Sequence, residues 1–164
     1  MKFLFLILSI SAFAQSKVGT VDVDFILSKM PELPAIQKDV ETYGKSLEAD
    51  LSKKYEAYNL LVEAYKKEEA GYTNEVKFQK QKEITDSEND IAKFQQNGSK
   101  MVALKRDEVL RPLYAKIGEA LEKVAKAEAF TQVLQINNDL VYLEPEYDLT
   151  VKVLNEMGIE FKPE

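Results

Sequence analysis

The chain has 164 residues, a formal net charge of −6, and neither histidine nor cysteine. The absence of these two residue types excludes disulfides, the usual zinc sites, thiol nucleophiles and histidine general bases. No glycine-rich phosphate loop is present either. The composition therefore predicts a protein that is not an enzyme and that has no cofactor and no metal site.

Residues 1–14 have the features of a secretory signal peptide. Lys2 precedes an apolar run over 3–10, and Ala12 and Ala14 form the small-x-small pattern that signal peptidase cleaves. The apolar run is shorter than the ~20 residues that a membrane-spanning helix needs. We expect cleavage after Ala14, export across the inner membrane into the periplasm, and a mature chain that is not inserted in a membrane.

A strand-like segment follows at 17–27, where Val21 and Val23 alternate with polar residues. Asp24 is a candidate cap for a short helix that ends before Pro31. The next strand-like segment, 130–136, comes more than a hundred residues later. A lone strand leaves backbone donors and acceptors unpaired, so the intervening chain must bring these two segments together.

The intervening segment, 34–129, has the apolar periodicity of two long helices. The first stripe is Ile36, Val40, Tyr43, Leu47, Leu51, Lys54, Tyr58, Leu61 and Tyr65, and the second is Ile84, Ile91, Gly98, Val102, Val109, Leu113, Ile117, Ala120 and Val124. Between them, in 70–74, Gly71 is a candidate C-cap and Thr73 and Asn74 are candidate N-caps. The pattern predicts an antiparallel helical hairpin, an arm with its tip near 70–74 and a length of about 55 Å.

Folding the arm at its predicted tip places glycines opposite larger residues. Gly44 falls near Met101, and Gly98 falls near Leu47. Such pairs suit close helix packing, but each glycine weakens its helix by up to ~1 kcal/mol. We therefore expect arms that bend.

The two ends of the mature chain, 15–33 and 130–164, should form a small β-rich head. We expect 130–136 and 140–143 to form a β-hairpin around an asparagine-rich turn at 137–139. A final helix is expected with Asp148 or Thr150 as its N-cap and with Val151, Leu154 and Met157 on one helical face. The predicted fold class is thus α+β and mostly helical: a small β head with a long antiparallel helical hairpin.

A head of this size has a marginal core without metal, disulfide or partner. Since the first two are excluded by composition, we expect identical heads to associate through their sheets. The candidate residues of this oligomer interface and head core are Val21, Val23, Phe130, Val133, Leu134 and Ile136.

The sequence resembles the Skp (OmpH-like) family of periplasmic chaperones. The resemblance includes KVGTVDVDFILSKMPE near the start, AGYTN near the tip, LRPLYAKIGEALEKVAKAEAFTQVL, and YDLTVKVLNEM near the end. It implies a homotrimer whose heads form one β-body, with three helical arms around a cavity. It also implies an ATP-independent holdase that keeps unfolded outer-membrane β-barrel proteins soluble during transit across the periplasm.

The chain departs from the best-known members of that family in its charge, because those members are basic. Residues 17–33 and 130–164 together contain 4 Lys and Arg against 10 Asp and Glu, whereas 34–129 is almost neutral. This distribution argues against nucleic-acid binding and against strong electrostatic capture of acidic clients or lipopolysaccharide. We expect client contacts to be mainly apolar.

Several apolar residues of the arm fall outside the two stripes and are candidates for client binding. They are Tyr55, Leu60, Val62, Phe78, Phe94, Met101 and Leu104. Each could instead complete a broad seam between the helices or a contact between subunits. The alternative function is a cell-envelope coiled-coil structural or adaptor protein, which would use the arm as a rigid spacer.

Overall fold

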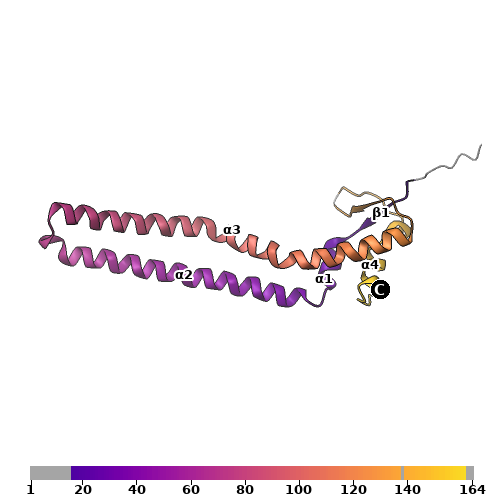
Figure 1. Ribbon diagram of the computed structural model, residues 1–164, viewed down its shortest axis with the longest axis horizontal. Helices are drawn as coiled ribbons and strands as arrows, with labels where there is room; N and C mark the ends of the chain where they lie inside the picture. The colour runs from indigo at the N-terminus through magenta and orange to yellow at the C-terminus, as the bar shows by residue number, and fades with distance from the viewer. Residues whose placement is uncertain (1–15, 138, 162–164) are drawn as a thin grey trace, which may run out of the picture. The chain divides into compact units, whose positions relative to one another are not determined.

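The computed structural model describes residues 16–137 and 139–161, and these are mostly helical with one small sheet (Figure 1). The α+β, mostly helical fold class is confirmed. The predicted signal peptide lies outside the described residues. The chain divides into two compact units: Pro31–Tyr114 is one, and the described residues up to Met30 join those from Ala115 onward in the other.

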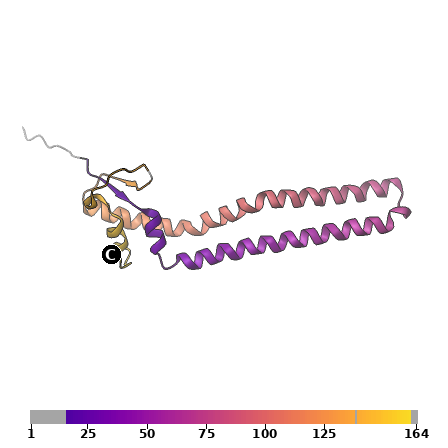
Figure 2. The ribbon, with the colours of Figure 1, turned by 180° about the vertical axis from the view of Figure 1, so that it is seen from behind.

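The unit Pro31–Tyr114 contains the predicted helical hairpin. Helix α2 spans Leu33–Glu68, and helix α3 begins at Asn74 and continues to Ala127. The two run side by side in Figures 1 and 2. Pro34 stands in the first turn of α2, where a missing backbone N–H leaves no intrahelical bond unmade. Along its course beside α2, α3 departs from a straight line in both views, as expected for a bending arm.

The tip of the hairpin differs from the prediction in how α2 ends. Gly71 does not act as a C-cap in the left-handed region; instead α2 tightens into the 3-10 turn η1, Glu69–Gly71. Thr73 behaves as predicted, because its Oγ1 accepts a hydrogen bond from the backbone N–H of Val76 at 3.3 Å. This bond satisfies one of the free donors at the start of α3.

The first predicted apolar stripe faces the seam between α2 and α3, as does the second as far as Val109, but the seam is shallow. Ile117, Ala120 and Val124, at the end of the second stripe, are buried in the other unit. Every residue of the first stripe is half-buried, and α2 has no fully buried residue. Ile91, from the second stripe, is among the few buried residues of this unit. The arm is therefore held by partial apolar contact along its length rather than by an enclosed core.

In the second unit, the strand near the start of the chain pairs with the segment that follows α3. Strand β1, Val18–Val21, pairs in parallel with β2, Gln132–Gln135, and Val18 lies opposite Gln132. On the other side of β1, the backbone N–H of Leu149 donates to the carbonyl of Thr20 at 2.8 Å. The predicted approach of the two chain ends is thus confirmed.

The predicted β-hairpin over 130–143 is wrong. Residues 140–143 form no strand, and the sheet of the described residues has only β1 and β2. Instead of reversing to pair with 140–143, β2 takes β1 as its neighbour, with Ile136 N–H donating to the carbonyl of Val21 at 2.8 Å. After β2, Leu140 N–H donates to the carbonyl of Asn137 at 3.2 Å.

Helix α1, Val23–Lys29, begins two positions earlier than predicted because Asp22, not Asp24, is its N-cap. The Oδ1 of Asp22 accepts a hydrogen bond from Phe25 N–H at 2.8 Å. The backbone N–H of Asp22 donates to Thr150 Oγ1, also at 2.8 Å, so the cap region of α1 is tied to the far end of the chain. Thr150 is buried, and this bond satisfies a polar group that is withdrawn from water.

The last helix, α4, spans Thr150–Glu156. The N-cap is Leu149, so neither Asp148 nor Thr150 holds the predicted cap position. The Oδ1 of Asp148 accepts from Thr150 N–H at 2.9 Å in a local turn just before the helix. Of the three residues predicted to share one face, Leu154 is buried, while Val151 and Met157 are half-buried; Val153 is buried as well. The helix starts one residue later than an Asp148 cap would give.

The core of this unit comes from both chain ends and from the end of α3. Its buried side chains are Val21, Ile26, Leu27, Met30, Ile117, Ala120, Val124, Phe130, Leu149, Val153 and Leu154. Lys17 makes two contacts with the segment after α3. Its Nζ lies 3.8 Å from the ring centre of Phe130 and donates to the carbonyl of Glu128 at 3.0 Å. A cation over an aromatic face and at a helix C-terminus is favourable on both counts.

Helix α3 ends in a Schellman turn that places a strained residue, Ala129, in the left-handed region at φ 57°. Phe130 N–H bonds back to the carbonyl of Ala125, and Ala129 N–H bonds back to that of Lys126. Glycine adopts this conformation without the Cβ penalty. Ala129→Gly should therefore stabilise the unit by about 1 kcal/mol, raising the midpoint of urea denaturation. A lowered midpoint would contradict the turn geometry.

Candidate functional site

The arm exposes large apolar side chains on both helices. Among the predicted client-binding residues, Leu60 is 67% exposed, Phe78 69% and Leu104 64%, and Tyr55 is also exposed. Val62, Phe94 and Met101 are half-buried. The exposed residues come from α2 and α3 and are separated along the arm, so they form scattered apolar points rather than one continuous patch.

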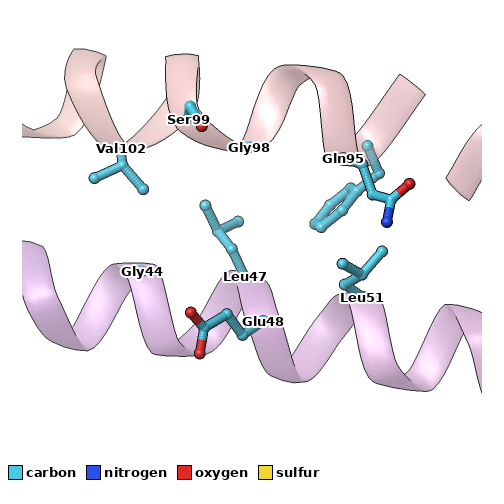
Figure 3. Close-up of a pocket in the computed structure, with 9 residues that line it drawn as sticks. Gly44, Leu47, Glu48, Leu51, Gln95, Gly98, Ser99 and Val102 are labelled. Atoms are coloured by element: carbon cyan, nitrogen blue, oxygen red, sulfur yellow. The ribbon is translucent and has the colours of Figure 1, made fainter. Parts of the chain in front are cut away.

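A pocket of about 290 Å³ lies between α2 and α3 (Figure 3). Its lining residues are Gly44, Leu47, Glu48, Leu51, Phe94, Gln95, Gly98, Ser99 and Val102. In Figure 3, Leu47 points from α2 toward α3 and Val102 points from α3 toward α2. The predicted register is confirmed, because Leu47 and Gly98 line the same pocket.

The expected close packing at these glycines is absent. A Cβ added at Gly44 or Gly98 would meet no atom within 4 Å, so neither glycine is required by a tight helix approach. The missing side chains instead leave space in the seam, which the pocket occupies.

Polar links cross the arm on both sides of this pocket. Toward the tip, Lys54 Nζ lies 2.5 Å from Asp90 Oδ2, and Gln95 Nε2 donates to Tyr55 Oη at 3.0 Å. Toward the other end, Lys105 Nζ lies 3.3 Å from an Asp39 oxygen. These groups are solvent-accessible, so each link contributes little to stability and mainly fixes the register of the two helices.

The unit that contains the sheet also exposes apolar side chains. Leu134 is 57% exposed, Val141 98% and Tyr142 77%, and Val18 and Leu140 are exposed as well. Of the predicted head residues, Val21 and Phe130 are buried, whereas Val23, Val133 and Ile136 are half-buried. Leu134 therefore belongs to the surface and not to the core of this unit.

Sequence reasoning missed Leu140, Val141 and Tyr142 as surface residues. The signal was present, since the run LVYL is apolar and its neighbours are turn residues. The turn residues at 137–139 led to the assignment of this run as the second strand of a hairpin, whereas in the structure it forms no strand.

Perturbed titratable groups lie on the surface rather than in a cleft. A hydrogen bond to Glu68 raises the pKa of Tyr72, and one to Glu146 raises the pKa of Tyr147. The bond to Asp86 similarly raises the pKa of Lys82. These are local surface contacts, and the described residues contain no group of three or more Asp and Glu that could hold a metal ion. Nothing in this arrangement resembles a general acid–base pair.

Among the described residues, no helix is both long and apolar enough to cross a bilayer. The two long helices instead carry charged residues throughout.

Comparison with known proteins identifies the family of this strand–hairpin–strand–helix arrangement. The model of the family described as Outer membrane protein (OmpH-like) matches residues 17–157. The chain belongs to the OmpH-like family. The matched region of this OmpH-like chain contains both helices of the arm, both strands and helix α4.

A solved structure supports the OmpH-like fold. It comes from Caulobacter crescentus CB15, is described as an OmpH-like outer membrane chaperone, and is 15% identical with a TM-score of 0.62. The alignment covers 87% of this chain and 83% of the other. At 15% sequence identity, this structural similarity supports a shared fold only. No curated protein matches the sequence.

Proposed function

We propose that this OmpH-like protein is an ATP-independent holdase chaperone of the periplasm. In this proposal it assembles as a homotrimer, and its three arms surround a cavity that holds unfolded outer-membrane β-barrel proteins and keeps them soluble. Membership of the OmpH-like family and the fold shared with an OmpH-like outer membrane chaperone support a chaperone role. The predicted signal peptide supports the location.

The observation that carries the proposal is the exposure of large apolar side chains along the arm. Leu60, Phe78 and Leu104 present most of their surface to solvent although charged residues surround them in sequence. Apolar surface contributes ~25 cal/mol per Å² when it is removed from water. Several partial contacts of this kind would hold an unfolded chain without reading its sequence, and the charged neighbours would keep the empty surface hydrated.

The trimer is supported by the surface of the unit that contains the sheet. On the side away from β1, strand β2 has no strand partner among the described residues, and Leu134, Val141 and Tyr142 are exposed nearby in the sequence. An open sheet edge with apolar neighbours favours association with another copy. We propose that residues 15–33 and 130–164 form this association head and that 34–129 form the arm.

The charge distribution supports apolar clients over nucleic acid. The excess of acidic residues is concentrated in 17–33 and 130–164, which together contain 10 Asp and Glu but only 4 Lys and Arg. A polyanion would be repelled there, while the nearly neutral arm tolerates clients of either charge.

Light scattering of a urea-denatured outer-membrane barrel protein diluted into buffer tests the proposal. One trimer per client should suppress the rise in scattering without nucleotide. A spacer or adaptor protein would leave scattering unchanged at this ratio, and that result would refute the holdase function.

A further inference from the structure

Asn97 and Gly98 form a reactive pair within α3. Asn97 is the one asparagine of the sequence that precedes a glycine, since the others precede leucine, glutamate, aspartate or asparagine. The side chain of Asn97 is exposed. A side chain on the following residue shields the backbone nitrogen of that residue, whereas glycine allows close approach to it. Among the backbone nitrogens that follow an asparagine, that of Gly98 is therefore the least shielded.

The surroundings of Gly98 leave room for this nitrogen to react. A Cβ added at Gly98 would meet no atom within 4 Å, and Gly98 lines the pocket of about 290 Å³ between α2 and α3 (Figure 3). Among the described residues, no hydrogen bond or ion pair joins α2 to α3 between the ion pair of Asp39 and the hydrogen bond of Gln95, and Gly98 lies within that stretch. The turn around Asn97 can therefore rearrange without displacing packed side chains at Gly98 or breaking a link between the helices.

The helix itself restrains the reaction. Because α3 continues from Asn74 to Ala127, the backbone N–H of Gly98 donates within the helix. Closing a ring onto Asn97 requires this hydrogen bond to open and the backbone to leave helical angles. Glycine, the weakest helix former after proline, makes such an opening about fivefold more frequent than alanine would. The reaction thus proceeds through rare local openings of the helix.

We propose that Asn97 is a site of spontaneous deamidation, which converts it to aspartate and isoaspartate as the protein ages. The backbone nitrogen of Gly98 bonds to Cγ of Asn97, and the side-chain amide leaves as ammonia with the proton from Gly98. Water then opens the resulting succinimide ring at one of its two carbonyl groups. One opening gives aspartate, and the other gives isoaspartate, whose main chain is longer by a methylene group. Water is the only co-reactant.

The two products affect α3 differently. Aspartate keeps the backbone and adds a carboxylate, for which Lys93 and Lys100 are helical neighbours four residues before and three residues after it. Isoaspartate lengthens the main chain, so the hydrogen bonds between residues i and i−4 lose their register. Isoaspartate therefore unwinds α3 locally and weakens the arm. The functional consequence, which rests on the proposed holdase function, is that the aged protein loses client holding.

Peptide mass spectrometry of the full mature protein, kept for several weeks in warm, mildly alkaline buffer, tests the site. Trypsin cleaves after Lys93 and Lys100, so the peptide 94–100 reports on Asn97. This peptide should gain the mass of an amide-to-acid conversion and separate into aspartate and isoaspartate forms. Asn89 is the internal control, because it is exposed on the same helix but precedes an aspartate, and its peptide should stay unchanged. A sample digested without incubation corrects for conversion during digestion.

Gly98→Ala is the matched variant, since its added methyl group meets no atom within 4 Å. It should slow the conversion at least about tenfold, because openings are rarer and the nitrogen is shielded. A synthetic peptide of residues 94–100 should convert faster than the protein, because it has no stable helix to open. An unconverted protein beside a converted peptide, equal conversion at Asn89, or equal rates in the variant and the wild type would overturn the site. Equal rates in peptide and protein would overturn the opening step.

Light scattering with a urea-denatured outer-membrane barrel protein tests the functional consequence. Aged wild type should lose holding capacity in proportion to its isoaspartate fraction. Asn97→Asp adds the charge without lengthening the main chain and should hold clients like fresh wild type, as should aged Gly98→Ala. Equal holding by fresh and aged wild type would overturn the consequence. Failure of fresh wild type to hold any client would refute the holdase function, while the peptide result would still decide the modification.

Discussion

Gly19→Ala should destabilise the unit that contains the sheet by about 3 kcal/mol, at the upper end of the cost of overpacking a core. A Cβ at this position would lie 2.4 Å from Leu149 Cδ1 and 2.8 Å from Phe130 Cε1. Leu149 is fully buried and Phe130 nearly so, and neither can move aside without displacing other core residues. The midpoint of urea denaturation, followed by far-ultraviolet circular dichroism, measures the loss.

Gly118→Ala is the control for this substitution, because its added methyl group meets no atom within 4 Å. It should be neutral or slightly stabilising, since alanine favours a helix over glycine. Equal stability of Gly19→Ala and the wild type would contradict the close approach of β1 to Leu149 and Phe130. If the head is also the association surface, Gly19→Ala should lower the fraction of trimer at micromolar concentration.

Replacing Leu60, Phe78 and Leu104 together with serine should weaken client holding on the order of a hundredfold. Each side chain is mostly exposed, so its loss removes client contact and not core packing. If each buries about 40 Å² against a client, the three contribute about 3 kcal/mol in total. The measurement is the concentration of protein that suppresses half of the scattering from a denatured outer-membrane barrel protein.

A matched triple variant controls for helix propensity: Asn59→Ser, Gln79→Ser and Ala103→Ser. These positions are exposed, adjacent to the three apolar residues and on the same helices. The control should hold clients like the wild type, and both variants should keep the wild-type mass and helical content. Equal holding by the apolar variant and the wild type would show that these residues do not bind clients.

The arm could be predicted from the sequence because its determinants are local. An apolar period of about 3.6 residues and the turn residues near Thr73 predict two helices and the register between them. The structure agrees, because Leu47 and Gly98 line the same pocket. The space beside Gly44 and Gly98 could not be predicted, because a small residue in a seam is compatible with either close packing or a void. That choice depends on the separation of the helices.

The sheet was harder to predict because its pairing is not local. The strand at Val18–Val21 was expected to meet the returning chain, and it does, but parallel to β2 and without the 140–143 partner. Thr150 was interpreted as a helix cap, yet its hydroxyl accepts from the backbone of Asp22, near the other end of the mature chain. A single sequence gives no signal for a bond between residues so far apart.

Native mass spectrometry of the mature protein, alone and with a denatured outer-membrane barrel protein, tests the central claim most directly. We predict a trimer at low micromolar concentration and a complex of one trimer with one client. A folded protein that stays monomeric and binds no client would contradict the account, because a single arm encloses no cavity.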